Sequence, residues 1–352
     1  MNSEIMDLSE RIESFSSLGQ LLRTTLSGEY TDISRQLDDL INNQYLKNKW
    51  FTPGNVREAF QALADELTFE NLSRWTNSYP VLNTHLKPSN VGVIMAGNIP
   101  LVGFHDFLSV LISGNNIIAK TSSKDKDLLR FVAEVLCTIN PGFSDRIHFT
   151  EGRLSGFDAI IATGSDNSAR YFDYYFGKYP NIIRRNRNSV AVITGHESES
   201  ELADLGKDVF TYFGLGCRNV SGIFIPEGYD PSDITRYWQK YSDLVNHAAY
   251  ANNYDYNKAV YMVNRERFDD TGFLLLKEDR SLSSPVAVLY FGYYDDPATL
   301  RTELGALADR IQCIVGAGFI PFGRSQAPSL WDYADNVDTM EFLLKKNIAG
   351  NF

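Results

Sequence analysis

The chain has 352 residues, of which 43% are hydrophobic and 22% charged, and its formal net charge is −11. This length favours two domains over one simple core, and the negative charge argues against a nucleic acid or an anionic membrane as a partner. No apolar run approaches the roughly 20 residues that span a bilayer, so no transmembrane segment is expected. The acidic N-terminus lacks the apolar core of a signal peptide, and we expect a cytoplasmic protein.

Residues 1–80 are expected to form a helical N-terminal segment. Apolar residues recur at helical spacing over residues 4–26, and two further helices are predicted near 31–47 and 54–77. Asn55 is the expected N-cap of the third helix, with Glu58 completing an approximate capping box. The segment is typical of a scaffold layer without chemistry of its own.

From residue 90 onward, short β-branched runs alternate with helical stretches, which indicates βαβ units and a parallel sheet within an α/β domain over residues 81–205. Parallel sheets bind ligands outside the carboxyl ends of their strands, so the loops after these strands are the expected binding region. The predicted strands are 91–96, 116–121, 159–164 and 189–194, and the predicted helices are 101–113, 124–139 and 167–179.

A second α/β domain is predicted over residues 206–325, followed by a C-terminal tail over 326–352 with a helix around 340–345. The boundary near 205 depends on a change of pattern. The predicted strands of this domain are 221–226, 259–263, 286–290 and 312–315. Aromatic residues are dense between Tyr237 and Tyr261, where they fit either core packing or the wall of an acyl channel.

Three widely spaced cysteines without a CxxC pair indicate a reducing environment and neither a disulfide framework nor a zinc site. Cys137 and Cys313 have the surroundings of small buried hydrophobes. Cys217 differs, because it ends a Gly-Leu-Gly-Cys turn before a predicted strand and precedes Arg218, which favours the thiolate. Cys217 is therefore the candidate nucleophile.

Two further residues stand at predicted strand ends. Asn98 lies in a Gly-Asn-Ile-Pro loop that is either a plain turn or the source of a side-chain amide for a developing oxyanion. Lys120 closes an apolar strand, and Ser122 and its neighbours surround it with donors suited to a phosphate or a ribose. An ordinary exposed lysine is the alternative reading.

Other candidates carry weaker signals. The basic run 184–188 is either a solvated loop or a landing place for phosphates. No histidine has metal-ligand spacing, no metal is expected, and a Cys-His pair with His105 or His247 stays open. P-loop, HExxH and GxSxG motifs are absent, and the glycines before Cys217 follow a helix rather than a strand, which argues against a dinucleotide fingerprint.

Five motifs in order resemble the aldehyde dehydrogenase superfamily, and within it the LuxC-like acyl-CoA reductase (fatty acyl reductase) family, over roughly residues 85–325. The resemblance implies an α/β fold with a nicotinamide cofactor-binding domain, a second α/β domain that holds the nucleophile, and the helical N-terminal segment. It also suggests a homo-oligomer, by analogy alone. The motifs are Gly-Asn-Ile-Pro (97–100), Gly-Asn-Asn-Ile-Ile-Ala-Lys (114–120), Thr-Gly-Ser (163–165), Gly-Leu-Gly-Cys (214–217) and Ser-Pro-Val-Ala-Val-Leu-Tyr-Phe (284–291).

The resemblance also implies roles for single residues. Cys217 matches the catalytic nucleophile and Asn98 the oxyanion-hole asparagine, while Lys120 matches the lysine that binds the adenosine ribose of the cofactor. Gly164 and Ser165 match the turn near the cofactor phosphates. Pro285 matches the start of the strand that follows the loop at the nicotinamide ribose.

Two departures from the aldehyde-oxidising members concern glutamates. The glutamate that activates the deacylating water would fall near Arg184, and the one that holds the nicotinamide ribose would fall at Ser281. The absence of the water-activating glutamate favours release of the acyl group by hydride over release by water. The polar cluster around Ser122 tolerates a 2′-phosphate, so NADPH is expected rather than NADH.

The expected function is reduction of an acyl-CoA to an aldehyde through an acyl-cysteine, with NADPH. Three alternatives stay open: a reductase of acyl phosphates with the same fold, a cysteine acyltransferase or thioesterase without hydride transfer, and a non-catalytic binding module.

Overall fold

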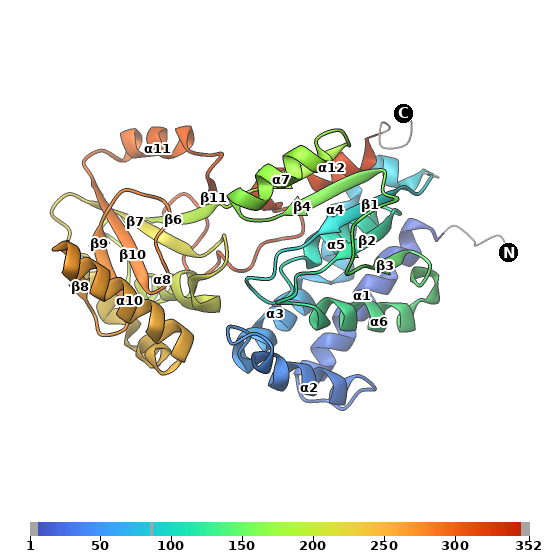
Figure 1. Ribbon diagram of the computed structural model, residues 1–352, viewed down its shortest axis with the longest axis horizontal. Coiled ribbons are helices and arrows are strands. Elements are labelled where there is room, and N and C mark those ends of the chain that lie inside the picture. Colours follow the sequence, from blue (N-terminus) through green and yellow to red (C-terminus); the bar gives the residue numbers. More distant parts are fainter. Residues whose placement is uncertain (1–5, 85–86, 346–352) are drawn as a thin grey trace. The chain divides into compact units, whose positions relative to one another are not determined.

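The computed structural model describes residues 6–84 and 87–345 (Figure 1). The chain forms two compact units, one made of residues up to 185 together with those from 329 onward, and the other made of residues 186–328. The domain boundary expected near residue 205 falls inside helix α8 (Glu199–Phe210), and the strand expected at 189–194 belongs to the second unit.

Helices α1 (Leu8–Leu26), α2 (Ser34–Asn43), α3 (Pro53–Glu66) and α4 (Phe69–Asn77) form the predicted N-terminal segment. Asp7 starts α1 with a capping box, since its side chain accepts from the Glu10 N–H while the Glu10 carboxylate accepts from the Asp7 N–H, both at 2.8 Å. Gly19 is required where α1 meets Leu67, because a Cβ there would lie 2.1 Å from the Leu67 carbonyl oxygen. Two short 3-10 helices, η1 (Gln44–Leu46) and η2 (Pro80–Asn83), complete the segment.

Two details of this segment differ from the sequence prediction. Thr52 caps α3, accepting from the Asn55 N–H at 3.3 Å, so Asn55 is not the cap. The single helix expected over 54–77 is two helices, because Thr68 accepts from the Asn71 N–H and starts a new one.

The sheet of the first unit has five parallel strands in the order β3-β2-β1-β4-β5. α5 (Phe104–Ile112) packs against β1 and β2, and α7 (Asp166–Phe176) packs against β4 and β5. Because the chain runs outward from β1 in both directions, the switch point lies between β1 and β4. The strands are β1 (Asn90–Ile94), β2 (Asn116–Lys120), β3 (Ile147–Phe149), β4 (Ala159–Thr163) and β5 (Asn181–Arg184), and the remaining helices are α6 (Asp127–Ile139), η3 (Pro141–Phe143), η6 (Ala334–Asn336) and α12 (Thr339–Leu344).

The second unit holds a six-stranded sheet in the order β11-β6-β7-β10-β9-β8, parallel except for the β8/β9 pair. Its strands are β6 (Asn188–Val192), β7 (Val220–Pro226), β8 (Asp269–Asp270), β9 (Leu275–Glu278), β10 (Val288–Tyr294) and β11 (Ile311–Gly316). Its other helices are η4 (Thr211–Gly214), α9 (Ser232–Thr235), η5 (Arg236–Asn246), α10 (Ala248–Asn264) and α11 (Pro297–Ala306).

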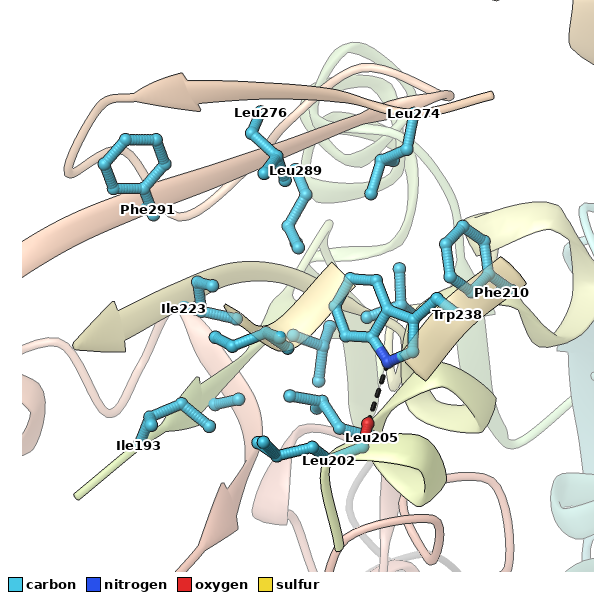
Figure 2. Close-up of a cluster of buried hydrophobic side chains, with 14 of the residues drawn as sticks. Ile193, Leu202, Leu205, Phe210, Ile223, Trp238, Leu274, Leu276, Leu289 and Phe291 are labelled. Atoms are coloured by element: carbon cyan, nitrogen blue, oxygen red, sulfur yellow. Dashed lines mark hydrogen bonds between the residues drawn. The ribbon is translucent and has the colours of Figure 1, made fainter. Parts of the chain in front are cut away.

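Trp238 lies at the centre of the core in the second unit, among side chains from the sheet and from α8 (Figure 2). Its indole N–H donates to the Leu202 carbonyl at 2.8 Å, and the hydroxyl of buried Tyr250 donates to the Phe273 carbonyl at 2.9 Å. Both rings are therefore satisfied core residues. Of the aromatic residues between Tyr237 and Tyr261, Trp238 and Tyr250 therefore serve core packing.

The strand predicted at 259–263 is wrong, because this segment is the end of α10. The buried residues of α10 are Tyr250, Tyr254, Asn257 and Tyr261, which recur at helical spacing. The sequence prediction favoured a strand here because the β-branched residues near Val260 are typical of strands.

Candidate functional site

The loops at the carboxyl ends of β1, β2 and β4 carry five of the predicted site residues. Asn98 follows β1, Lys120 and Ser122 stand at the end of β2, and Gly164 and Ser165 follow β4. β1 lies between the other two strands, so the structure gathers these loops at one edge of the sheet beside its switch point. This is where open parallel sheets bind ligands.

The Asn98 loop packs tightly on the loop after β2. A Cβ on Gly97 would lie 2.5 Å from both Cβ and Oγ of Ser122, so only glycine fits this approach. Asn98 is exposed, and Leu101 at the far end of the loop has φ +58°, a left-handed conformation that a branched side chain rarely adopts.

Asp125 holds this strained loop in place. Its carboxylate accepts a hydrogen bond from the Leu101 N–H at 2.8 Å and is almost fully buried. Burial raises the pKa of Asp125 to about 7, against the opposing effect of the Leu101 hydrogen bond. The sequence reading missed Asp125, since its partner is a backbone group that no residue pattern reveals.

Lys120 lies at the end of β2, half-buried, and its Nζ donates to the Gly152 carbonyl at 2.9 Å. The ammonium group is therefore aimed along the edge of the sheet toward the loop after β3. Ser122 is half-buried, and its Oγ accepts from the Lys124 N–H at 3.2 Å. The pair presents one cation and one hydroxyl beside the Asn98 loop.

Gly164 and Ser165 form the turn from β4 into α7. A Cβ on Gly164 would lie 2.8 Å from the Ser168 Cβ and 2.9 Å from the Phe172 ring, so glycine permits the close packing of strand and helix. Ser165 is exposed and caps α7, its Oγ accepting from the Ser168 N–H at 3.3 Å. The start of α7 thus presents backbone N–H groups near the switch point, which favours an anion.

Cys217 is exposed and occupies a tight turn just before β7 in the second unit. The Asn219 N–H donates to the Gly216 carbonyl at 3.0 Å, which makes Cys217 the second residue of a β-turn. The chain enters this turn through three successive left-handed residues, Tyr212, Phe213 and Gly214, with φ of 53°, 59° and 74°. Such a run is costly and persists only where the surroundings determine it.

The residues around Cys217 are fixed by buried polar groups. Arg218 donates from Nε to the Ser325 carbonyl at 2.6 Å, and Ser325 is held in turn by Asp208, which accepts from its N–H at 2.9 Å. Asp208 also accepts from the Gly323 N–H at 2.6 Å, and burial raises the pKa of Asp208. Arg218 therefore anchors the turn, a role the sequence did not reveal.

Cys313 and Cys137 differ from Cys217 in their surroundings. Cys313 is buried in β11, with its Sγ 3.1 Å from the Ser189 Oγ. Cys137 is half-buried on α6, and burial raises its pKa. Neither is exposed as Cys217 is.

Pro285 is exposed in the turn before β10. The Val288 N–H donates to the Pro285 carbonyl at 3.1 Å, and Ala287 has φ +64°, so this turn occupies the first two positions of the strand expected at 286–290. β10 begins at Val288.

The arginines of the basic run 184–188 bind other groups of the protein. Arg184 is only 5% exposed, pairs with Asp106 and donates to the Thr339 hydroxyl at 2.9 Å. Arg185 pairs with Asp173 at 2.8 Å, and Arg187 donates to the Ala308 carbonyl at 3.0 Å. These partners argue against the run as a phosphate site.

The two histidines considered as partners of the cysteine also have structural partners. His105 is half-buried in the first unit with Nε2 2.8 Å from the Leu330 carbonyl, and desolvation lowers its pKa. His247 caps α10 with Nδ1, and its ring contacts that of Phe213 in a tilted arrangement with centroids 4.4 Å apart. His247 therefore supports the chain that leads into the Cys217 turn.

Within residues 6–84 and 87–345, no three His, Cys, Asp or Glu side chains come together as metal ligands. The helices described in the same residues include none long and apolar enough to cross a bilayer.

Solved structures with a similar fold include several aldehyde dehydrogenases. An NAD-dependent aldehyde dehydrogenase from Sinorhizobium meliloti matches 88% of this chain and 70% of its own, with TM-score 0.63 and 13% identity. An NADP-dependent enzyme from E. coli matches 88% and 76%, with TM-score 0.61 and 12% identity. The NAD+ complex of a Bacillus cereus aldehyde dehydrogenase matches 90% and 72%, with TM-score 0.59 and 14% identity. The fold is thus aldehyde dehydrogenase-like, as predicted.

No curated protein sequence matches the chain significantly. Residues 36–226, more than half of the chain, match the family model for acyl-CoA reductase (LuxC). The match confirms the predicted family. The chain belongs to the LuxC acyl-CoA reductase family and is an oxidoreductase of the kind that reduces acyl groups to aldehydes.

Proposed function

We propose that this protein reduces a fatty acyl-CoA to the aldehyde with NADPH, through an acyl group held as a thioester on Cys217. The observation that carries the proposal is the exposed Cys217 at the corner of a turn whose neighbours are fixed by hydrogen bonds. A thiol in that position meets a substrate without displacing any core side chain.

In the first step the Cys217 thiolate attacks the carbonyl carbon of the acyl-CoA. A new C–S bond forms and the carbonyl becomes a tetrahedral oxyanion. The oxyanion then collapses, the C–S bond to CoA breaks, and CoA leaves as a thiolate. No strong base is required, since a thiolate is a good nucleophile and CoA a good leaving group.

The oxyanion needs hydrogen-bond donors, and we assign this task to the Asn98 side-chain amide and the Cys217 backbone N–H. Each such donor contributes about 3–4 kcal/mol to the transition state. The support for Asn98 is its exposure on a loop that Gly97 and Asp125 hold rigidly.

The residues at the edge of the first sheet suit a nicotinamide dinucleotide. Lys120 and Ser122 offer a cation and a hydroxyl to the adenosine ribose. Gly164 and Ser165 lead into the start of α7, whose backbone N–H groups suit the phosphates. We assign Pro285 to the nicotinamide side. When bound, the reduced nicotinamide supplies the hydride that releases the acyl group as an aldehyde. NADPH is favoured over NADH because Lys124 is exposed beside Ser122, where a 2′-phosphate would meet a cation.

Release by hydride rather than by water is supported by Arg184. The position where a water-activating glutamate is expected falls near this residue, which is buried and paired with Asp106. The chain therefore places a buried arginine at that point, and the Asp106 carboxylate beside it is held in the ion pair.

The decisive experiment is labelling of Cys217 by acyl-CoAs of several chain lengths that carry a radioactive acyl group. We expect stoichiometric label on Cys217 without NADPH, and its conversion to free aldehyde when NADPH is added. Cys217→Ala should take up no label and Cys313→Ala should label normally. Uptake by Cys217→Ala would refute the proposal, and label that leaves as free acid with NADPH present would indicate a thioesterase. Parallel assays with acyl phosphates test the alternative substrate class, since faster turnover of an acyl phosphate than of an acyl-CoA would identify an acyl-phosphate reductase.

A further inference from the structure

The side chain of Asn219 makes three hydrogen bonds, one inside the Cys217 turn and two to the chain that precedes it. Its Oδ1 accepts from the Gly216 N–H at 2.8 Å, and its Nδ2 donates to the Thr211 carbonyl at 2.8 Å and to the Asp208 carbonyl at 3.1 Å. Asn219 is 3% exposed, so water does not compete for these bonds. One amide thus joins the turn to the end of α8 and to the residue after it.

These bonds determine the direction of the peptide between Gly216 and Cys217. The Gly216 carbonyl points into the turn, toward the Asn219 N–H at 3.0 Å. Because the C=O and N–H of a trans peptide point in opposite directions, the Cys217 N–H points out of the turn. The peptide on the other side is fixed as well, since the Cys217 carbonyl accepts from the Ser189 hydroxyl at 2.9 Å.

We propose that Asn219 is a positioning residue of the reaction, which holds the Cys217 turn so that the thiol and the Cys217 N–H face the same acyl group. This inference rests on the proposed function of Cys217. The left-handed run Tyr212–Gly214 explains the need for it, since a strained chain leading into the turn relaxes unless something holds it. The two carbonyls that Asn219 binds belong to Asp208 and Thr211, in the stretch that leads into that run.

Two variants of Asn219 separate its contacts. Asn219→Ala removes all three side-chain hydrogen bonds. Asn219→Asp keeps an acceptor for the Gly216 N–H but loses both donations. Because displacement of a reacting group by about 1 Å costs about 10²-fold in rate, we expect Asn219→Ala to slow acylation by about that factor, and Asn219→Asp to fall between it and the wild type.

The matched control is Asn115, a buried asparagine in the first unit. Its Oδ1 accepts from the Ser89 N–H at 2.9 Å and its Nδ2 donates to the Ser113 hydroxyl at 3.0 Å, at the amino end of β2. Asn115→Ala removes the same kind of buried contact at the edge of the sheet opposite the candidate loops. We expect it to lower the melting temperature and leave the acylation rate of folded protein unchanged.

The experiment measures acylation by a labelled acyl-CoA and alkylation by iodoacetamide at Cys217, in full-length proteins whose folding is checked by thermal denaturation. Alkylation forms no oxyanion and depends little on the Cys217 N–H. We therefore expect Asn219→Ala to slow acylation about 10²-fold and alkylation by less than about threefold.

Acylation at the wild-type rate in either Asn219 variant would overturn the inference. A parallel fall of acylation and alkylation, or an equal loss in Asn115→Ala, would also overturn it, because both indicate a structural role alone. The two proposals fail separately: label on Cys217→Ala refutes the nucleophile, whereas normal labelling of Cys217 with unaffected Asn219 variants refutes only the positioning role.

Discussion

Asp125 is a buried carboxyl group whose hydrogen-bond partners are backbone groups, with the Leu101 N–H among them. Burial raises its pKa to about 7, while its carboxylate accepts the Leu101 N–H. The group therefore keeps its proton in the folded state at pH values where the unfolded chain has lost it. Its contribution to stability is fullest below about pH 4, falls as the pH rises toward 7, and is level above that range.

We predict that Asp125→Asn flattens this part of the pH dependence. The amide oxygen still accepts from Leu101 and carries no charge to be buried, so the variant should gain stability relative to the wild type as the pH rises from 4 to 7. Chemical denaturation at a series of pH values measures the effect. Parallel curves for the two proteins across this range would contradict the prediction.

The candidate residues that sequence reasoning found are those at the ends of elements. Asn98, Lys120 and Ser165 each follow a recognisable strand, so their shared edge of the sheet follows from the parallel topology. Asp125 and Asn219 escaped notice because their partners are backbone groups placed by strained turns. Asparagine in a glycine-rich turn is a weak signal, since it also occurs in ordinary turns.

At the scale of elements, Arg184 joins three segments that are far apart in the sequence. It ends β5, pairs with Asp106 on α5 and donates to Thr339 at the start of α12. Sequence reasoning placed this arginine in a loop, because nothing near position 184 reveals that α12 returns from the end of the chain. The strand wrongly predicted at 259–263 has a similar cause, because the buried face of α10 depends on contacts with segments far away in the sequence.

We predict that Arg184→Leu destabilises the protein by about 3–5 kcal/mol, because it leaves the Asp106 carboxylate buried without its cation. Arg185→Leu is the control, since Arg185 pairs with Asp173 at the surface and such pairs contribute at most about 1 kcal/mol. Equilibrium unfolding in urea measures both. Equal losses would show that burial of the Arg184 pair carries no special cost.

At the scale of the whole molecule, the chain leaves the first unit after residue 185 and returns to it at 329. The returning segment binds the first unit through polar contacts in its interior. The Leu330 carbonyl lies 2.8 Å from His105 Nε2, the Trp75 indole donates to the Tyr333 hydroxyl at 2.7 Å, and Tyr79 donates to Asp338 at 2.7 Å. The sequence predicted a tail with a helix around 340–345 but not its contacts, since these partners lie more than 200 residues away.

We predict that a chain ending at residue 328 loses stability in the first unit alone. Removal of the segment takes away Tyr333, which accepts from Trp75, the Leu330 carbonyl beside His105, and Thr339, which accepts from Arg184, whereas the core around Trp238 belongs wholly to the second unit. Hydrogen exchange should show faster exchange in α4, α5 and β5, with α8 and β7 still protected. A chain ending at residue 345 is the control, because it keeps every contact described above. Equal loss of protection in both units would mean that they unfold as one cooperative body, and no loss in α5 would mean that the returning segment does not stabilise the first unit.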